Sequence, residues 1–443
     1  MSTQLTRIGE RARKEQKLVF SSLYHHITDA DNLRACYRSI NGNKAVGLDG
    51  VTKEEYGKNL KGNLEDMSER LKRMGYRPQA KLRRYIPKPG SSEGRPLGIS
   101  IFEDKIVEEA VKRTIEPIYE AVFEDSSYGF RPGRNQHECL DALGCTIQQR
   151  KINHVVEADI KSFFDKVNHD WLVKFLEHRI GDKRVIRLIQ RMLKSGIMED
   201  GLTHASEAGT PQGSILSPLL SNIFLHYVLD LWFRIKIKQR AKGESHYFRF
   251  ADDFLACFQY EEDARMFRES LQDRLEGFGL ELSEEKTKSI KFGRFAQENA
   301  NKQGKKPEEF TFLGFTHYCG KTKEGYFKVK RRTSRKKFGA SLRAFTDWAR
   351  RSRNMQTKVE MIRIARVKVI GHLNYYAITD NMEKCGDYVY YATRILFKWI
   401  NRKSQRGSYT WSAFNQVLSW QDWPSPKIQR DLNPCRRSKT LKG

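Results

Sequence analysis

The sequence predicts an α+β protein of more than one domain, and three features of the chain indicate this class. The stretch 247–258 alternates apolar residues on both sides of Asp252 and Asp253, which is typical of two short strands joined at a hairpin turn. Farther along, apolar residues recur at three-to-four spacing from Phe345 to Leu373, which predicts long helices. A chain of 443 residues is also long enough for roughly two to four domains.

The charge of the chain indicates a polyanionic partner. Lys and Arg number 81 against 54 Asp and Glu, which leaves a net charge of +27. Residues 321–443 hold 29 basic and 8 acidic residues, so most of the excess lies in this region. Nucleic acid fits such an excess better than a membrane surface does. We therefore expect the C-terminal region to be a folded, helical and basic module.

Composition argues against membrane-spanning and secreted classes. No run of 18 apolar residues occurs, and the first 20 residues are polar and charged, unlike a secretory signal. The seven cysteines are scattered and include no Cys-x-x-Cys pair, so the sequence predicts neither a zinc site nor a redox couple. We expect no membrane partner and a location in a bacterial cytoplasm.

Three carboxylates are the candidate metal ligands. Val155 and Val156 indicate a strand that leads into Asp159, and Asp252 and Asp253 fall at the hairpin turn. Two adjacent carboxylates repel each other unless a cation lies between them, and Mg²⁺ prefers such oxygen ligands. A third carboxylate completes the set that two-metal phosphoryl transfer requires, so we expect two Mg²⁺ ions. For the adjacent pair alone, the alternative is a solvated polar turn.

A glycine-rich turn separates the two acidic segments. Gly209 and Gly213 permit a close approach of the backbone, Pro211 stiffens the turn, and Gln212 is presented from it. The helix expected after this turn runs through Leu219, Ile223 and Leu229.

These segments, with Phe250-Ala-Asp-Asp253 at the hairpin, resemble the sequence blocks of reverse transcriptases, in the order that this family has them. More narrowly, the chain resembles the reverse transcriptase/maturases encoded by bacterial group II introns. A single block is a weak signal, whereas a long ordered series leaves little room for coincidence. The other similar blocks lie at residues 43–52, 85–99, 128–134, 280–288, 310–315, 371–376 and 399–411.

The resemblance implies a right-hand polymerase fold. An N-terminal extension would occupy residues 1–40, fingers 41–150, and a palm with an antiparallel sheet 151–320. A helical thumb and a basic helical maturase (X) region would follow over 321–443. The apolar pattern from Ile8 to Tyr24 predicts a helix inside the N-terminal extension.

The resemblance also implies roles for single residues. Lys88 and Arg95 would bind the triphosphate of an incoming dNTP. Either Phe163 or Phe164 would be the aromatic gate against a ribose 2′-hydroxyl, with two core phenylalanines as the alternative. Lys286 would protonate pyrophosphate as it leaves.

One position departs from the family pattern. Most relatives have Tyr where this chain has Phe250, which keeps the ring and both neighbouring carboxylates but loses the hydroxyl. We expect activity to survive, with a change in how the primer is held or in fidelity. Phe250 and Gln212 are both expected to contact the bound substrates.

The function implied is an RNA-directed DNA polymerase that copies an RNA template from a DNA primer with dNTPs, and that binds its group II intron RNA to assist splicing and retromobility at target DNA. No Cys-rich or His-Asn-His endonuclease pattern occurs in the chain, so the resemblance is to the compact class of these proteins. One alternative is a domesticated reverse transcriptase acting in phage defence or DNA repair. An alternative of another class is a non-catalytic, RNA-binding splicing factor.

Overall fold

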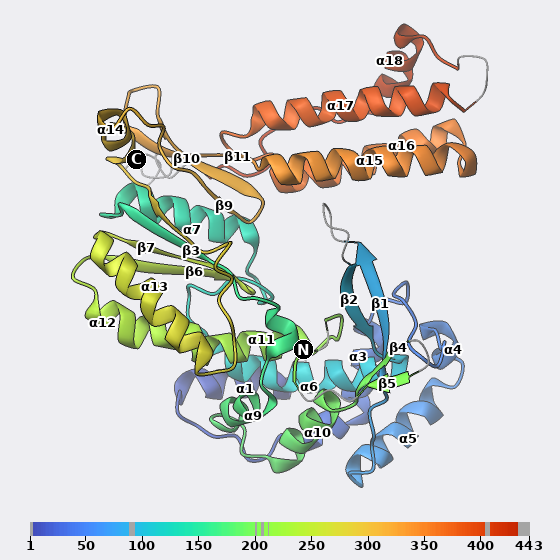
Figure 1. Cartoon of the computed structure of the whole chain (residues 1–443). Helices are drawn as coiled ribbons and strands as arrows, with labels where there is room; N and C mark the ends of the chain where they lie inside the picture. Colours follow the sequence, from blue (N-terminus) through green and yellow to red (C-terminus); the bar gives the residue numbers. More distant parts are fainter. Residues whose placement is uncertain are drawn as a thin grey trace. The chain divides into compact units, whose positions relative to one another are not determined.

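The computed structural model describes residues 3–87, 94–199, 202–204, 208–210, 212–403 and 408–432. Two compact units make up the chain (Figure 1). The first comprises Met1–Gln136, Val156–Ala256 and Glu261–Ser289, and the second comprises His137–Val155, Cys257–Tyr260 and Ile290–Gly443. This division into two does not test the four sequence segments expected above, which stay a prediction.

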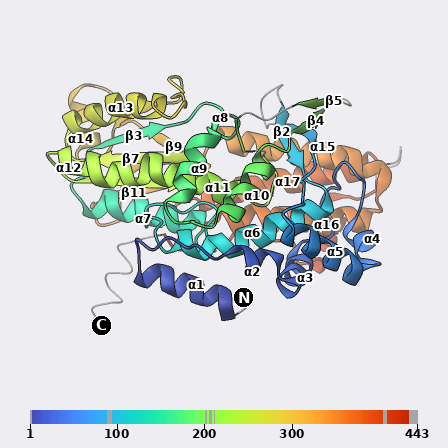
Figure 2. The same ribbon diagram turned by 90° about the horizontal axis from the view of Figure 1, so that it is seen from below.

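A long helix, α6 (Phe102–Glu120), is the core element of the first unit. Its apolar face is buried, and α1 (Thr3–Lys14), α2 (Tyr24–Thr28) and α3 (Ala30–Ser39) pack along it (Figures 1 and 2). The close contact with α1 depends on Gly9, where an added Cβ would lie 3.2 Å from the Cβ of Pro117. The other helices of this unit are α4 (Lys53–Gly57), α5 (Leu60–Lys72), α8 (Phe163–Lys166), α9 (His169–Glu177), α10 (Lys183–Leu193), α11 (Ser217–Leu225), α12 (Lys238–Arg240) and α13 (Glu261–Glu276).

The N-terminal segment differs from the single helix expected up to Tyr24. Helix α1 ends at Lys14, and the chain then extends so that the Phe20 N–H donates to the carbonyl of Arg179 at 2.8 Å. Asp182 ends this extended stretch, because its carboxylate accepts from the N–H groups of Leu23 and Tyr24, both at 2.9 Å. A tertiary partner therefore overrides the helical pattern.

One four-stranded sheet of the first unit has the order β2-β1-β4-β5. Strands β1 (Lys81–Pro87) and β2 (Gly94–Ile99) form an antiparallel hairpin in which Ile86 pairs with Arg95. Strand β4 (Ile197–Glu199) runs parallel to β1, and β5 (Leu202–His204) is antiparallel to β4. Strands β1 and β2 fall in the segment expected to form the fingers, whereas β4 and β5 fall in the segment 151–320 expected to form the palm.

A second four-stranded sheet carries the candidate site. Its order is β6-β7-β3-β8, formed by β6 (Ser245–Phe250), β7 (Asp253–Phe258), β3 (His154–Ala158) and β8 (Lys288–Lys291). The strand before Asp159 and the hairpin around Asp252 are thus confirmed as elements. The helix expected through Leu229 is α11, but it continues as π-helical segments η1 (His226–Asp230) and η2 (Phe233–Ile237).

The second unit combines a small sheet with long helices. The sheet has the order β11-β10-β9, with antiparallel pairing throughout, and α15 and α17 lie side by side (Figure 1). Helix α16 begins at a capping box formed by Thr357 and Glu360. The elements of this unit are α7 (Gln136–Gln149), α14 (Ala296–Lys302), β9 (Phe310–Phe312), β10 (Phe315–Lys321), β11 (Phe327–Thr333), α15 (Arg335–Met355), α16 (Lys358–Tyr376), α17 (Met382–Asn401) and α18 (Trp411–Trp420).

Candidate active site

The hairpin between β6 and β7 presents its two aspartates in different surroundings. Ala251 begins the turn with a φ of +57°, a left-handed conformation that costs an L-residue energy unless neighbours enforce it. Asp252 follows and is half-buried, whereas Asp253 begins β7 and is exposed. The backbone therefore turns within two residues and leaves both carboxyl groups at one end of the sheet.

Asp159 follows β3, the strand next to β7, and its environment comes from the segment 280–288. The Ser283 N–H donates to the Asp159 carbonyl at 2.8 Å, and the Lys161 N–H donates to the Glu281 carbonyl at 2.9 Å. These bonds bring Lys286 to the site, where its Nζ is ion-paired with Oδ2 of Asp159. Two segments more than 100 residues apart in sequence thus meet at one carboxylate.

Electrostatics connect all the charged groups of this site. Burial raises the pKa of Asp252, the negative charge of Asp159 raises it further, and the Arg95 guanidinium opposes both effects. The hydrogen bond to Asp159 raises the pKa of Lys286, and the charges of Asp253 and Asp252 add to this effect. Arg95, Lys286 and the three aspartates therefore share one local field.

A family profile described as "Reverse transcriptase (RNA-dependent DNA polymerase)" matches residues 86–317, which include these five groups. The chain belongs to the reverse transcriptase family. It is 36% identical over 237 residues to the Group II intron-encoded protein LtrA of Lactococcus lactis subsp. cremoris, a match that covers 53% of this chain and 39% of that protein. Much of LtrA thus lies outside the match.

Two further relatives extend the comparison. Protein YkfC of Escherichia coli (strain K12) is 31% identical over 321 residues, covering 65% of this chain and 84% of YkfC. Nuclear intron maturase 1, mitochondrial, of Arabidopsis thaliana is 33% identical over 96 residues, covering 21% of this chain and 13% of that protein. The resemblance to group II intron-encoded proteins expected from the sequence is confirmed.

The three aspartates are the kind of ligands that a hard divalent cation binds. Carboxylate oxygens are what Mg²⁺ prefers, and Asp159 and Asp252 are close enough for the charge of one to raise the pKa of the other. The Lys286 ammonium shows that positive charge is already favoured there. Within the described ranges, however, no three His, Cys, Asp or Glu side chains are gathered into a ready metal-binding group.

The glycine-rich turn contacts strand β2 directly. The Gly98 N–H donates to the Gln212 carbonyl at 2.6 Å, and Gly213, at a φ of +106°, lies so close to β2 that an added Cβ would be 3.0 Å from the Gly98 carbonyl oxygen. The structure thus gives Gly213 two physical requirements, a left-handed backbone and close approach. Pro211 lies outside the described residues.

A buried carboxylate, Glu108 of α6, fastens the same turn from behind. Its Oε1 accepts from Lys81 Nζ at 2.6 Å and from the Ser100 hydroxyl at 2.9 Å, and its Oε2 accepts from the Ile215 N–H at 2.9 Å. Burial raises the pKa of Glu108, but Lys81 and the three hydrogen bonds more than offset this and hold it below its ordinary value. Sequence analysis missed Glu108, since no local pattern separates it from the other charged residues of α6.

The phenylalanines considered for the gate differ in burial. Phe163 is 2% exposed and packs against Phe164 and Phe224, with ring centroids 5.2 and 6.3 Å away. Phe164 is only half-buried, and its carbonyl accepts from the Thr210 N–H at 2.7 Å. Phe250 ends β6 and is half-buried. Lys88 lies outside the described residues, so its part in the site stays a prediction.

A separate cavity of about 590 Å³ lies in the first unit, and among the described residues its lining does not include the three aspartates. The residues that line it are Gln16, Lys17, Ala121, Val122, Phe123, Glu124, Asp125, His178, Arg179, His226, Tyr227, Leu231 and Arg234. Cations and carboxylates mix along its wall, and Arg234 is ion-paired with Glu124 at 2.8 Å. The candidate active site is therefore defined by its charged groups and not by this cavity.

The second unit exposes aromatic rings among its cations. Tyr376 is buried, whereas Trp411 is 41% exposed. Trp420 at 77% and Tyr390 at 55% are more exposed still, so both rings are accessible to a partner.

Among the described residues, no helix is long and apolar enough to cross a membrane.

Proposed function

We propose that this protein is an RNA-directed DNA polymerase that extends a DNA primer on an RNA template with dNTPs and Mg²⁺. The observation that carries the proposal is the charged constellation at the sheet end: Asp252 and Asp159 close enough to repel, with Lys286 ion-paired to Asp159. Membership of the reverse transcriptase family supports the substrates.

Each side chain has a distinct role in this mechanism. Asp159, Asp252 and Asp253 would hold two Mg²⁺ ions, which supply a lowered pKa for the primer 3′-hydroxyl and neutralise charge on the leaving pyrophosphate. Arg95 and Lys88 would grip the triphosphate. Lys286 is a cation at neutral pH, and its ammonium lies beside Asp159. From there it would give a proton to pyrophosphate as this group leaves.

Sugar selection is assigned to Phe164. Phe163 is buried among other rings, whereas Phe164 is half-buried beside the turn that carries Gln212. A bulky ring there would exclude a ribose 2′-hydroxyl sterically. Gln212 and Phe250 would contact the bound template, primer or nucleotide.

We also propose that the protein binds a group II intron RNA and assists its splicing and movement into target DNA. Support comes from the names of its relatives, which include a group II intron-encoded protein and an intron maturase. The excess of basic residues in 321–443 and the exposed rings of Tyr390 and Trp420 suit a folded polyanion with unpaired bases. A bacterial cytoplasm as the location stays a prediction.

Primer extension tests the polymerase. With poly(rA)/oligo(dT) and Mg²⁺, the wild-type protein should incorporate dTTP, and Asp252→Asn should lose at least about a thousandfold of kcat because a metal ligand is removed. Primer–template affinity, measured by fluorescence anisotropy without Mg²⁺, should change less than threefold. Incorporation at the wild-type rate in Asp252→Asn would contradict the assignment, and an inactive wild type would favour the non-catalytic splicing factor.

The gate has a matched pair of variants. Phe164→Val should admit ribonucleotides, raising kcat/KM for UTP relative to dTTP by about 100-fold, since a steric exclusion is removed. Phe163→Val should leave this ratio unchanged and lower thermal stability, because it leaves a cavity among buried rings. The reverse pattern in the two variants would move the gate to Phe163.

A splicing assay distinguishes a protein that assists its group II intron from a domesticated reverse transcriptase. Self-splicing of the intron RNA encoded around this gene should be stimulated by the protein at low Mg²⁺. An active polymerase that gives no stimulation would favour the alternative in which the protein acts in phage defence or DNA repair.

A further inference from the structure

We propose that Arg249 is a positioning residue for polymerisation: it fixes the Ala251–Asp252 turn through a hydrogen bond to the Ala251 carbonyl, and Asp230 and Asn222 hold Arg249 in place. The inference rests on the proposed polymerase function for its kinetic consequence, while its structural consequence can be measured independently.

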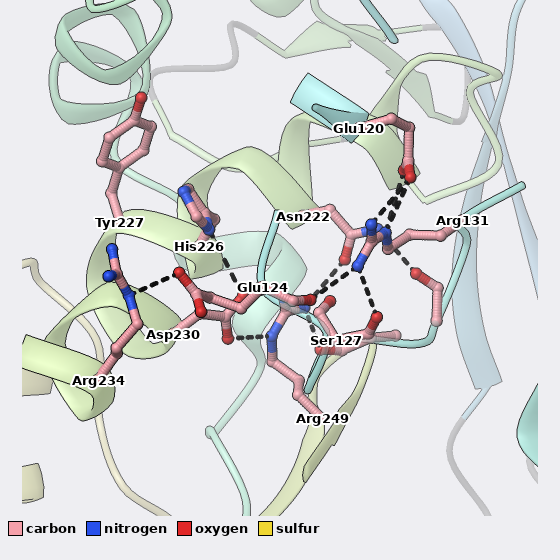
Figure 3. A network of polar contacts seen from close by, with 12 residues as sticks. Glu120, Glu124, Ser127, Arg131, Asn222, His226, Tyr227, Asp230, Arg234 and Arg249 are labelled. Carbon is pink, nitrogen blue, oxygen red and sulfur yellow. Dashed lines mark hydrogen bonds and ion pairs between the residues drawn. The ribbon is translucent and has the colours of Figure 1, made fainter. Parts of the chain in front are cut away.

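Arg249 is fully buried and fully engaged on both sides of its guanidinium. Its Nε and Nη2 donate to the two carboxylate oxygens of Asp230 at 2.7 and 2.6 Å, and the side chains of both residues are 0% exposed (Figure 3). Its Nη1 donates to Oδ1 of Asn222 at 2.9 Å and to the Ala251 carbonyl at 3.0 Å. One planar group thus connects a helix to the turn that presents the aspartates.

The turn needs such a support because its backbone is in a costly conformation. Ala251 has a φ of +57°, and surrounding structure must enforce an L-residue in this region. The carbonyl that Arg249 binds belongs to this same residue, immediately before Asp252. The hydrogen bond therefore acts on the peptide unit that sets the direction in which the Asp252 side chain leaves the backbone.

A second segment closes on the turn from the other side. The Arg249 N–H donates to the Ser126 carbonyl and the Tyr128 N–H donates to the Arg249 carbonyl, both at 2.8 Å. Gly129 then passes so close that an added Cβ would lie 2.2 Å from the Ala251 nitrogen. Asn222 links the two supports, since its Nδ2 donates to the Gly129 carbonyl at 2.8 Å while its Oδ1 accepts from Arg249.

Only arginine satisfies all of these acceptors. A guanidinium offers five N–H donors in a rigid fork, so it can bind a carboxylate through Nε and Nη2 and still donate to Asn222 and Ala251 with the two N–H groups of Nη1. A lysine ammonium is a point donor and cannot cover both directions from one position. The prediction is that lysine keeps the charge pair with Asp230 but loses the bond to the turn.

The partner helix is irregular where it supplies the anion. Asp230 is the last residue of the π-helical segment η1, and π-helical turns inside α-helices are frequent at functional sites. His226, one turn earlier, brings its Nδ1 to 3.9 Å from Oδ2 of Asp230 (Figure 3). A buried ion pair is weak support for stability in itself, and its best-attested use is to specify one arrangement.

The kinetic consequence follows because catalysis tolerates little displacement of a metal ligand or reacting group. A shift of about 1 Å in a reacting or ligand group costs up to about 100-fold in rate. If Arg249 sets the Asp252 direction, weakening its bond to Ala251 should lower kcat far more than the affinity for primer–template, because the bond acts on the peptide unit before Asp252.

The test compares Arg249→Lys with a double variant, Arg249→Met with Asp230→Leu, and with the control Arg70→Lys. The double variant removes both charges together, so no buried charge is left alone. Arg70 resembles Arg249 in binding a carboxylate through two nitrogens, those to Glu103 at 2.9 Å each, although its side chain is 33% exposed. Its side-chain hydrogen bonds to described residues go to Asp66 and Glu103 and do not reach the hairpin.

Two readouts are needed. In EDTA, hydrogen exchange measured by mass spectrometry should rise at least tenfold in peptides covering 245–258 for Arg249→Lys and for the double variant, with melting temperatures within a few degrees of wild type. With Mg²⁺ and primer–template, kcat should fall 10- to 100-fold in both, while KM for dTTP and the duplex Kd change less than threefold. Arg70→Lys should alter neither the hairpin exchange nor kcat.

Each other outcome overturns the proposal. Unchanged hairpin exchange and kcat in Arg249→Lys would show that the bond to Ala251 is dispensable. If the double variant keeps wild-type protection of the hairpin, packing alone holds the turn and the hydrogen bond to Ala251 is not needed. If neither variant folds, Arg249 and Asp230 are required for folding of the whole unit and not specifically for the turn. If wild type does not polymerise, the exchange result in EDTA still decides the positioning role, so the two failures are distinguishable.

Discussion

Among the described residues, Arg249 and Arg331 are the two arginines with less than 2% of their surface exposed. They lie one in each compact unit, and their partners differ in kind. Arg249 in β6 is 0% exposed and binds the carboxylate of Asp230, whereas Arg331 in β11 is 1% exposed and donates to the main-chain carbonyl of Leu140 at 2.7 Å. Burial lowers the pKa of each, but Asp230 holds that of Arg249 above its ordinary value, while that of Arg331 falls to about 10.

The difference teaches how each unit uses a buried cation. Arg249 is ion-paired with Asp230 and also donates from Nη1 to the carbonyl of Ala251 in the strained turn, so the planar shape of its guanidinium matters. Arg331 binds the Leu140 carbonyl of helix α7 to strand β11, and the charges of Asp141 and Asp380 raise its pKa against the effect of burial. We therefore expect the first to be irreplaceable and the second to tolerate an apolar side chain.

The largest expected effect is the contrast between Arg249→Met and Arg331→Met. The first leaves Asp230 buried without its cation, which should cost about 3–5 kcal/mol of unfolding free energy. The second loses hydrogen bonds to carbonyls but also removes a desolvated charge, so about 1–2 kcal/mol is expected. Urea denaturation followed by circular dichroism measures both, and equal losses would contradict the comparison.

Gly129→Ala should be next in size. An added Cβ would lie 2.2 Å from the Ala251 nitrogen, which is backbone and cannot move aside cheaply, so about 2–3 kcal/mol is expected with a displaced hairpin. Gly371→Ala in α16 is the control from the other unit, since an added Cβ there meets nothing within 4 Å. It should stabilise by about 0.5–1 kcal/mol. An unchanged free energy of unfolding in Gly129→Ala would mean that the hairpin can move to make room for a methyl group.

The smallest effect concerns two buried histidines. Burial lowers the pKa of His226 in the first unit and of His372 in the second to about 4, against an ordinary value of 6.5. Between pH 4 and pH 6.5 the unfolded chain therefore binds more protons than the folded chain. The contribution of each neutral histidine to the free energy of unfolding is fully present above pH 6.5 and is lost as pH falls toward 4. Each histidine should account for about 2 kcal/mol between pH 7 and pH 5.

Replacing either histidine by glutamine should remove that share of the pH dependence in thermal melts. Asp230 opposes the shift at His226, whereas His372 stacks on Tyr388 with centroids 3.4 Å apart. A shallower loss at His226 than at His372 would show that Asp230 supports the protonated ring, and an unchanged slope in both variants would refute the assignment.

The strands and turn that carry the aspartates could be predicted from sequence because their signals are local. Alternating apolar residues flank Asp252, and a short apolar strand precedes Asp159, so both elements follow from period and burial. The family resemblance then predicts that Asp159 lies close to Asp252 and Asp253. The long helices of the second unit were predicted equally well, since Ile362, Ala365 and Val369 recur at helical spacing and are buried.

The supports of the site could not be predicted, because each depends on contacts distant in sequence. Glu108 and Ile215 are 107 residues apart, and Gly129 meets Ala251 from another segment. Arg249 did carry one local signal, a charge at an inward position of an apolar strand. Such a residue requires a buried partner, but periodicity does not say that the partner is Asp230.

The bonds of Glu108 limit how this protein can be recombined with its relatives. Because one carboxylate binds Lys81, Ser100 and Ile215, the turn that presents Gln212 is not an independent module. A chimaera that imports this turn alone would pair it with a foreign α6 and β1. Successful exchanges should therefore carry all three segments together, and crossover points should fall outside 81–216.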